Sequence, residues 1–354
     1  MLGWMFRNGG TDNEDIPDDL RQSQDEKRLP VHIMADDARL SIEDGLVRIQ
    51  SDGAERILRL GEISSLSIHG GATLTAPALR ALAKAAVPVV LHSRSGSYTA
   101  QLVNLSGSHA ETRRAQYAAA TNPTVALDIA RALVEAKIRN AARLMRRRMG
   151  AADAVTKRLE RDALSATRAK SMDTLRGLEG AAAAAWFGAW PRLLTSNDAM
   201  FAFCGRTRRP AQDAVNALIS YLYAVLAGQM AAATLAAGLD PNVGFLHAER
   251  PGRPALALDL IEPLRTAVVD AGVIAALNNG EFDAVDFAVQ PDGGMRLTDQ
   301  GRRTALSVLE RRLSTVLSYD GMNISWRAAM SHQALALARR LRKGSGPLPT
   351  PSPK

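Results

Sequence analysis

The apolar pattern of this 354-residue chain changes once, near Ser106, and that change sets the fold class. Before it, short runs of alternating or β-branched residues repeat with the period of strands. After it, apolar residues recur every three or four positions, as on one face of a helix. The sequence therefore predicts an α+β chain, with a small β-rich, β-sandwich-like domain at 31–106 and a larger all-α domain at 107–343. The flanking segments lack core-forming patterns, so we expect a mobile leader at 1–30 and a disordered tail at 344–354.

Turn and cap residues divide the β-rich domain. Glu43-Asp44-Gly45 and Ser51-Asp52-Gly53 separate strand-like runs with residues that favour hairpin turns. Thr75 has a side chain suited to a helix N-cap, and a helix is expected in the Ala- and Leu-rich segment that follows it. Strand patterns then resume on either side of Ser95-Gly96-Ser97.

Positive charge is concentrated in the second part of the chain. Residues 1–106 carry 11 Lys and Arg against 14 Asp and Glu, a net of −3, whereas residues 107–354 carry 33 against 22, a net of +11. A positive field attracts polyanions, nucleic acid first among them, although an Arg-rich helix can equally be a solvated face.

One predicted helix combines an apolar stripe with a cationic face. The stripe consists of Leu127, Ala130, Val134, Ile138, Ala141 and Met145. Such an amphipathic helix either lies at the surface or contacts phosphates. The candidate DNA-contacting residues, on this helix and in two later clusters, are Arg139, Arg143, Arg146, Arg206, Arg208, Arg209, Arg250 and Arg253.

Composition places the chain among globular proteins. It has 46% hydrophobic and 23% charged residues, and no apolar run near the roughly 20 residues that a membrane span needs, so we expect no membrane segment. Residues 7–26 are polar and acidic, unlike a secretion signal, and a cytoplasmic location is expected. Cys204 is the only cysteine, which excludes an internal disulfide, and we expect it to be a buried apolar residue.

Acidic and imidazole side chains meet in one short segment. His247 lies twelve residues before Asp259 and fifteen before Glu262, and a three-residue offset places the two carboxylates on one face of an otherwise apolar helix. Such a pair is costly to desolvate without a positive charge between its members, which a divalent metal would supply. Simpler interpretations remain: a hydrogen-bonded loop histidine, an Asp259 paired with Arg253 or Arg265, and a surface Glu262.

Glu179 is the best candidate to complete such a site. It stands at the start of an uncharged, Ala-rich helix whose small residues permit close packing, so its carboxylate is expected to face protein. The alternative is a first-turn glutamate stabilised by the helix dipole. A set of carboxylates with one imidazole suits Mg²⁺ or Mn²⁺, whereas zinc would recruit more His or Cys. No Walker loop, GxGxxG or GxSxG motif is present, which weakens nucleotide-hydrolase and serine-hydrolase interpretations.

From Val31 to Lys343 the chain resembles the CRISPR-associated protein one family, the integrases and endonucleases of spacer acquisition. Four segments carry the resemblance, in the family's order: 63–103, 113–147, 175–190 and 213–265. The last is the most specific, because it contains NALISYLY, GLDPNVGFLH and DLIEPLR. Trp186 stands where the family often has tyrosine, a departure that removes no ligand.

The resemblance implies roles for the candidate residues. It makes Glu179, His247 and Glu262 the ligands of Mg²⁺ or Mn²⁺, with Asp259 as a further catalytic residue that holds a second metal or orients His247. It implies an N-terminal β-domain that mediates homodimerisation and a helical catalytic domain that holds metal and DNA. The implied activity, in antiviral defence, is that of an endonuclease and integrase: a 3′-hydroxyl of a short duplex prespacer attacks a phosphodiester of a CRISPR repeat. A small companion adaptation protein would complete the complex.

Three other functions remain open. A stand-alone transposase-like integrase would use the same catalytic domain without the companion protein. A non-catalytic DNA-binding scaffold would keep its DNA transactions when Glu179, His247 or Glu262 is replaced by alanine. A small-molecule metallohydrolase would act without DNA.

Overall fold

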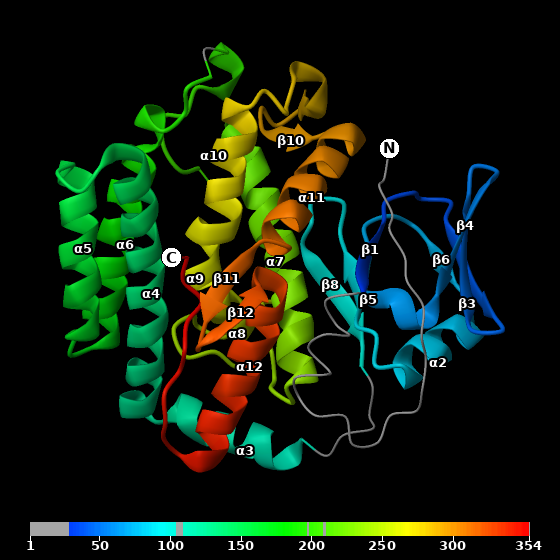
Figure 1. Cartoon of the computed structure of the whole chain (residues 1–354), viewed down its shortest axis with the longest axis horizontal. Helices are drawn as coiled ribbons and strands as arrows, with labels where there is room; N and C mark the ends of the chain where they lie inside the picture. Colours follow the sequence, from blue (N-terminus) through cyan, green and yellow to red (C-terminus); the bar gives the residue numbers. More distant parts are fainter. Residues whose placement is uncertain (1–27, 104–108, 197, 208–209, 354) are drawn as a thin grey trace. The chain divides into compact units, whose positions relative to one another are not determined.

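The computed structural model describes residues 28–103, 109–196, 198–207 and 210–353 (Figure 1). Strands dominate the N-terminal part and helices the rest, which confirms the predicted α+β class. The chain divides into two compact units between Val89 and Val90, earlier than the boundary near residue 106 that the sequence pattern predicts. Most of the leader expected at 1–30 lies outside the described residues, and its last two residues, Leu29 and Pro30, already belong to a strand.

One four-stranded sheet follows directly from the predicted turns. Its strands are β2 (Arg39–Glu43), β3 (Leu46–Ser51), β4 (Ala54–Arg59) and β6 (Thr73–Leu74), in the order β4-β3-β2-β6. Two-residue turns at Asp44-Gly45 and Asp52-Gly53 join the antiparallel strands, and their φ angles are 49° and 74° in the first and 49° and 73° in the second. That backbone matches the right-handed twist of hairpin strands, and Asp-Gly adopts it readily.

A second sheet has the strand order β1-β5-β7-β8. Its strands are β1 (Leu29–Ile33), β5 (Ile63–Ile68), β7 (Val89–His92) and β8 (Tyr98–Leu102), and β1 runs parallel to β5. Helix α2 (Ala76–Lys84) precedes β7 in the chain. As predicted, Thr75 caps this helix, its side chain accepting a hydrogen bond from the Ala78 amide.

Helices make up most of the second unit (Figure 1). They are α3 (Ala110–Thr121), α4 (Pro123–Met149), α5 (Ala154–Thr167), α6 (Met172–Gly188), α7 (Ala214–Ala236), α8 (Ala255–Leu260), α9 (Glu262–Leu264), the π-helix η4 (Arg265–Asp270), α10 (Ala271–Asn278), α11 (Asp299–Leu313) and α12 (Trp326–Lys343). The 3₁₀ helices among the described residues are η1 (Leu60–Glu62), η2 (Trp190–Arg192), η3 (Ala199–Phe201) and η5 (Ala284–Asp286).

The sequence predicted that the larger part of the chain is all-α, but the structure has two pairs of short strands there. Strands β9 (Phe287–Val289) and β10 (Met295–Leu297) form one antiparallel pair, and β11 (Val316–Tyr319) and β12 (Met322–Ser325) form another. Each strand has only three or four residues, too few for a two-residue apolar period to stand out from the helical segments around it.

Helix α4 carries the predicted apolar stripe. Of the six stripe residues, five are buried and only Leu127, near the start of the helix, is partly exposed. The helix packs against α5 and α6. Two polar residues, Lys137 and Asn140, lie on the same inward side, and both are bonded to side chains or carbonyl groups from later in the chain.

Helix α7 lies in the core of the second unit. By length and composition it could cross a membrane, contrary to the prediction that no apolar run reaches that length. In the structure 78% of the apolar stretch is buried inside the protein. A helix that is apolar all round is the expected form of a core helix, so α7 is weak evidence for a membrane span.

The structure corrects two local predictions. The C-terminal segment, expected to be disordered, lies against α4. The fully buried Asn140 donates to the Pro351 carbonyl at 3.0 Å and accepts from Ser352 Oγ at 2.5 Å, while Arg143 donates to the Pro353 carbonyl at 2.9 Å. Cys204, expected to be buried, is exposed.

Two irregularities interrupt the helical segment from α8 to α10. Pro263 lacks an amide hydrogen and its ring would clash with the carbonyl four residues earlier, that of Asp259, so α8 ends at Leu260 and α9 begins at Glu262. The Pro263 carbonyl accepts a hydrogen bond from Asn140 Nδ2 at 2.7 Å. The next turn, η4, is π-helical, a rare conformation that occurs often at functional sites.

Candidate functional site

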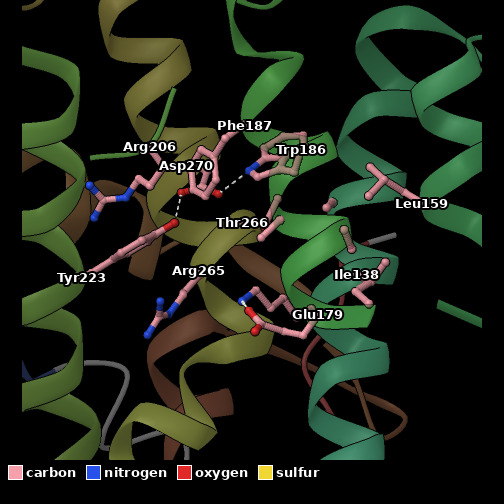
Figure 2. A pocket seen from close by; sticks show the side chains of 14 residues that line it. Ile138, Leu159, Glu179, Trp186, Phe187, Arg206, Tyr223, Arg265, Thr266 and Asp270 are labelled. Atoms are coloured by element: carbon pink, nitrogen blue, oxygen red, sulfur yellow. Dashed lines mark hydrogen bonds and ion pairs between the residues drawn. The ribbon is translucent and has the colours of Figure 1, made fainter. Parts of the chain in front are cut away.

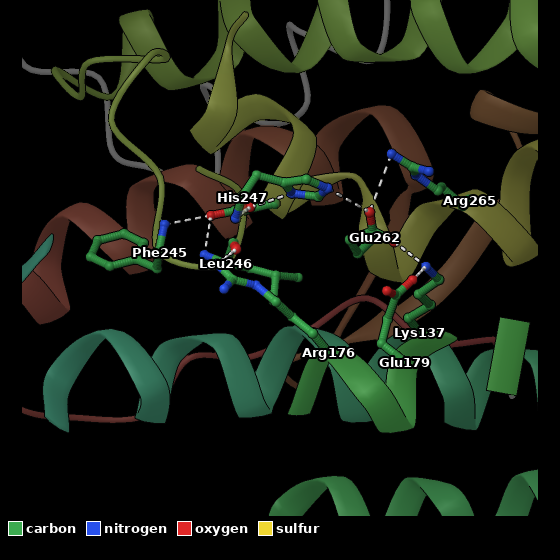
Figure 3. Close-up of polar contacts among 9 residues, drawn as sticks. Lys137, Arg176, Glu179, Phe245, Leu246, His247, Glu262 and Arg265 are labelled. Atoms are coloured by element: carbon green, nitrogen blue, oxygen red, sulfur yellow. Dashed lines mark hydrogen bonds and ion pairs between the residues drawn. The ribbon is translucent and has the colours of Figure 1, made fainter. Parts of the chain in front are cut away.

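The four candidate catalytic residues come from four parts of the second unit. Glu179 lies on α6, His247 in the loop between α7 and α8, Asp259 on α8, and Glu262 at the start of α9. His247 contacts both Asp259 and Glu262, and Glu179 is connected to Glu262 through Lys137 (Figure 3). The structure thus brings all four residues into one continuous set of polar contacts.

Asp259 organises the loop that carries His247. Its side chain is fully buried, and Oδ2 accepts hydrogen bonds from the amides of Phe245 (2.6 Å) and Leu246 (2.9 Å). Its other oxygen, Oδ1, accepts from the amide of His247 (3.0 Å) and from the Nδ1 of the same residue (2.6 Å). With both oxygens occupied, Asp259 has no free position for a second metal ion. The geometry favours its other predicted role, that of orienting His247.

Gly244 makes room for this arrangement. A Cβ atom at that position would lie 2.7 Å from Asp259 Oδ2 and 3.0 Å from the backbone carbonyl carbon of Ala255. Real Cβ atoms essentially never approach other atoms to 2.7 Å. The loop can therefore approach the carboxylate this closely only because residue 244 is glycine.

His247 directs its second ring nitrogen at Glu262. Nδ1 bonds to Asp259, and Nε2 lies 3.7 Å from Glu262 Oε1. A neutral imidazole that donates from Nδ1 keeps a lone pair on Nε2, which is the form that binds metal ions. Arg176 adds a second hold on the loop, because its Nη2 donates to the Leu246 carbonyl at 2.8 Å. Arg176 stands one turn before Glu179 on α6, so the helix of one candidate ligand also holds the loop of another.

Glu262 is buried among positive groups. Its Oε2 lies 2.7 Å from Lys137 Nζ and its Oε1 lies 3.2 Å from Arg265 Nη2. Burial alone would raise the pKa of Glu262, but the charges of Arg265 and Lys137 lower it to about 2. Glu262 is therefore ionised throughout the physiological pH range.

Lys137 joins Glu262 to Glu179. Its side chain is only 14% exposed, and Nζ forms an ion pair with Glu179 Oε1 as well as with Glu262. Burial alone would lower the pKa of Lys137, but Glu262 and Glu179 raise it above its ordinary value. Lys137 was not among the residues predicted for the site, although the sequence contains a signal for it: Lys137 falls three residues after Val134 and four before Ala141, on the apolar stripe of α4.

The donor atoms of the site suit Mg²⁺ or Mn²⁺ in kind. Two carboxylates and one imidazole nitrogen make a ligand set in which most donor atoms are oxygen, as hard cations prefer. Glu262 Oε2 is buried and receives no well-aligned hydrogen bond, although Lys137 is at ion-pair distance. Within the described ranges, no three acidic, His or Cys side chains approach closely enough to enclose a metal ion as they stand. The side chains fit a metal chemically, but the two glutamates pair with the ammonium group of Lys137.

A second polar network, centred on Asp270, adjoins the first. The Asp270 carboxylate accepts hydrogen bonds from Trp186 Nε1 at 2.8 Å and from the Tyr223 hydroxyl. Two guanidinium groups face the Tyr223 ring, that of Arg265 at 4.8 Å and that of Arg206 at 5.8 Å from its centroid. Both networks line one cavity of about 50 Å³, whose wall includes Lys137, Glu179, Trp186, Arg206, Tyr223, Arg265 and Asp270 (Figure 2).

Asp270→Asn is expected to make the stability of the protein less dependent on pH. Burial raises the pKa of Asp270 from 3.8 to about 6, against the opposing effect of its hydrogen bonds from Tyr223 and Trp186. Between these two pKa values the folded state binds more protons than the unfolded state, so the wild type loses stability as pH rises from about 4 to about 6. The loss levels off above pH 6 at about 3 kcal/mol. Urea unfolding should show that the free energy of unfolding of Asp270→Asn, relative to that of the wild type, is higher at pH 7.5 than at pH 4.5.

The exposed Asp320→Asn variant provides the control for this measurement. It should follow the wild-type pH dependence. A constant difference in unfolding free energy between Asp270→Asn and wild type at both pH values would show that Asp270 is charged and compensated in the fold.

The predicted DNA-contacting arginines differ in exposure. Exposed ones are Arg143, Arg146 and Arg250, partly buried ones are Arg139, Arg206 and Arg253, and Arg208 and Arg209 lie outside the described residues. Arg206 donates to Asn216 Oδ1 at 2.8 Å and to Ser220 Oγ at 2.9 Å, so its guanidinium is hydrogen-bonded to side chains of α7. Arg139 pairs with Glu135 at 2.7 Å. Among the exposed arginines, Arg143 donates to the Pro353 carbonyl and Arg146 pairs with Glu160, so these two are also bonded within the protein.

The family model and the related sequences that match this chain all belong to one family. Residues 31–311 match the family model described as CRISPR associated protein Cas1. The chain is 40% identical over 321 residues to a CRISPR-associated exonuclease Cas4/endonuclease Cas1 fusion of Rhodospirillum rubrum, covering 88% of this chain and 55% of the relative. It is 35% identical to CRISPR-associated endonuclease Cas1 3 of Thermus thermophilus, covering 88% of this chain and 93% of that protein. The chain spans 55% and 60% of the lengths of two such fusion proteins.

Solved structures share the fold. A casposase bound to integration product superposes with a TM-score of 0.79 at 24% identity, covering 90% of this chain and 92% of the casposase. A chain of a Cas6-RT-Cas1–Cas2 complex gives a TM-score of 0.74 at 22% identity, covering 90% of this chain and 35% of that one.

Proposed function

Because the chain belongs to the Cas1 family of CRISPR-associated proteins, we propose that it is an endonuclease and integrase that inserts short duplex DNA into a CRISPR array. The observation that carries the proposal is that Glu179, His247 and Glu262 belong to one continuous set of polar contacts, in which Lys137 pairs with both glutamates and His247 Nε2 lies 3.7 Å from Glu262 Oε1. A scaffold that only binds DNA has no need of two carboxylates and an imidazole drawn from three elements into its interior.

The proposed reaction is a transesterification between DNA strands. The oxygen of a 3′-hydroxyl on the incoming duplex attacks the phosphorus of a phosphodiester in the repeat. The bond between that phosphorus and its own 3′ oxygen breaks, and the departing oxygen takes up a proton to become a new 3′-hydroxyl. One phosphodiester replaces another, so the step needs neither a covalent enzyme intermediate nor an energy source. Endonuclease activity follows when water takes the place of the attacking hydroxyl.

Each residue of the site has a part in this reaction. Glu179, His247 and Glu262 would hold Mg²⁺ or Mn²⁺, which supplies polarisation of the target phosphate and activation of the attacking hydroxyl. Asp259 keeps His247 in the orientation and tautomer that point Nε2 at Glu262. Exposed arginines of the second unit would hold the DNA by its phosphates, without reading its sequence.

The proposed partners are DNA, a second copy of the chain joined through the β-rich domain, and a small companion adaptation protein, all in the cytoplasm. Support for the companion comes from the Cas6-RT-Cas1–Cas2 complex, since the chain of like fold there is part of an assembly with Cas2. A stand-alone integrase is the second candidate, because the casposase of like fold is described as bound to integration product.

Strand transfer of a labelled short duplex into a supercoiled plasmid that carries the cognate repeat array tests the proposal. The reactions contain Mg²⁺, Mn²⁺ or EDTA, are run with and without the companion protein, and use wild type, His247→Ala or the control His332→Ala. We expect joined product that requires metal and His247 but not His332.

The other outcomes identify the alternatives. Joining by His247→Ala at the wild-type rate would remove His247 from the mechanism. Joining that needs no companion protein would favour the stand-alone integrase. Tight DNA binding with no metal-dependent joining under any condition would favour the scaffold.

A further inference from the structure

Lys137 is the one cation in the described part of the chain that pairs with both Glu179 and Glu262. It reaches them from α4, where neighbouring stripe residues are buried and its own side chain is 14% exposed. Glu179 and Glu262 belong to different helices, α6 and α9, so the ammonium holds two elements together at the centre of the site.

We propose that Lys137 is the resident counter-ion of the metal-free site and that a divalent metal ion displaces its ammonium from between Glu179 and Glu262. This inference rests on the metal site of the proposed function. It adds to that site a residue that is not a ligand but sets the affinity for the metal.

Lys137 and a metal ion would compete for one position. Lys137 Nζ lies 2.7 Å from Glu262 Oε2 and also bonds to Glu179 Oε1, so it occupies the position from which one ion could contact both carboxylates. Mg²⁺ binds oxygen at about 2.0 to 2.1 Å, well inside the distance at which an ammonium and a metal ion could both touch the same pair of oxygens. The two cations therefore exclude each other between the carboxylates.

The two carboxylates favour a positive charge between them. The Glu262 side chain is only 2% exposed and that of Glu179 27%, and a buried carboxylate that lacks a cation is costly. A lysine supplies one positive charge on a flexible stem, and a divalent ion supplies two in a smaller volume. Metal binding thus exchanges one counter-ion for another, and the two ion pairs of Lys137 are broken in the process.

The structure also provides a place for the displaced ammonium. Lys137 and Glu179 line the cavity of about 50 Å³ that the Asp270 network lines too (Figure 2). The four-carbon stem of lysine has rotatable bonds throughout, so Nζ can swing into the cavity while α4 stays in place. The Asp270 carboxylate lines the same cavity and would give the ammonium an acidic partner there.

Calorimetric titration of the full-length protein with MnCl₂, without DNA, tests the inference. We expect Lys137→Met to bind Mn²⁺ about tenfold more tightly than wild type, since no ammonium has to be displaced, a change of about 1.4 kcal/mol. Lys137→Arg, which keeps the charge, should bind no more tightly than wild type, and the exposed control Lys157→Met should match wild type. In EDTA, Lys137→Met should melt below wild type, and Mn²⁺ should raise its melting temperature by the larger amount.

The outcomes separate this inference from the proposed function. Equal or weaker Mn²⁺ binding by Lys137→Met, with metal-dependent strand transfer intact in wild type, would overturn the role of Lys137 alone. If Glu262→Gln leaves Mn²⁺ binding unchanged, the metal site itself is wrong, and the inference falls with it. Should Lys137→Met be unfolded without metal, recovery of its circular dichroism spectrum on addition of Mn²⁺ supports the inference, and failure to recover overturns it.

Discussion

Asp259→Ala is expected to lower the free energy of unfolding by about 3 to 5 kcal/mol and to abolish strand transfer. The substitution leaves three backbone amides and one imidazole without their acceptor in a region where Asp259 itself is fully buried. Without that acceptor, the loop from Phe245 to His247 is expected to change conformation. The Nε2 of His247 would then no longer point toward Glu262. Urea unfolding measures the first effect and plasmid integration the second.

A surface aspartate gives the matched control. The Asp173 side chain is 97% exposed, so Asp173→Ala should change the unfolding free energy by no more than about 0.5 kcal/mol. Asp259→Asn separates the two effects, because its amide oxygen can still accept some of the bonds while its NH₂ group faces donors. Stability near the wild-type value in Asp259→Ala would mean that the loop is held by Arg176 and its own backbone instead.

Glu262→Gln is expected to reduce metal-dependent strand transfer by at least about a thousandfold, equivalent to about 4 kcal/mol of transition-state stabilisation. The amide keeps the size of the side chain but removes the charge that faces Lys137, Arg265 and His247. Two buried cations then lack a carboxylate, so stability falls as well. Because the folded pKa of Glu262 is lowered from 4.5 to about 2, its contribution to stability is complete above pH 4.5 and is lost as pH falls toward 2.

The comparison of Glu262→Gln with wild type therefore belongs above pH 5, with single-turnover joining rates and urea unfolding as the two measurements. Glu281→Gln is the control, since Glu281 pairs with Arg311 on the surface and should affect neither quantity measurably. Full activity in Glu262→Gln would show that the buried carboxylate is structural, and it would redirect the search for metal ligands to other residues.

Local chemistry determined which parts of the fold could be predicted. The Asp44-Gly45 and Asp52-Gly53 turns and the Thr75 cap depend on neighbouring residues only, so the strands beside these turns and the helix that follows Thr75 were predictable. The C-terminal segment was misjudged because its binding partner, Asn140, lies more than 200 residues away in the chain. No local pattern can reveal a contact of that kind.

The candidate site was predictable in its residues but not in its arrangement. Spacing drew attention to His247, Asp259 and Glu262 and placed the two carboxylates on one face of one helix, whereas in the structure they belong to two helices, α8 and α9, and His247 contacts both of them. Pro263 is one reason, because it ends the helix on which a shared face was expected. Lys137 was missed for another: a lysine on an apolar stripe becomes informative only when the elements that face it are known.

The π-helical turn η4 has a consequence for how the chain can vary in length. Each residue of an α-helix advances the angular position of the next by 100°, so one residue more per turn rotates everything that follows by that angle. Deleting a residue from the turn would leave Arg265 beside Glu262 but carry Asp270 a quarter-turn or more away from Tyr223. Side chains here can be exchanged one at a time, but residues cannot be inserted or removed without separating two networks that share a cavity. The number of residues in this turn therefore sets the orientation of one network relative to the other.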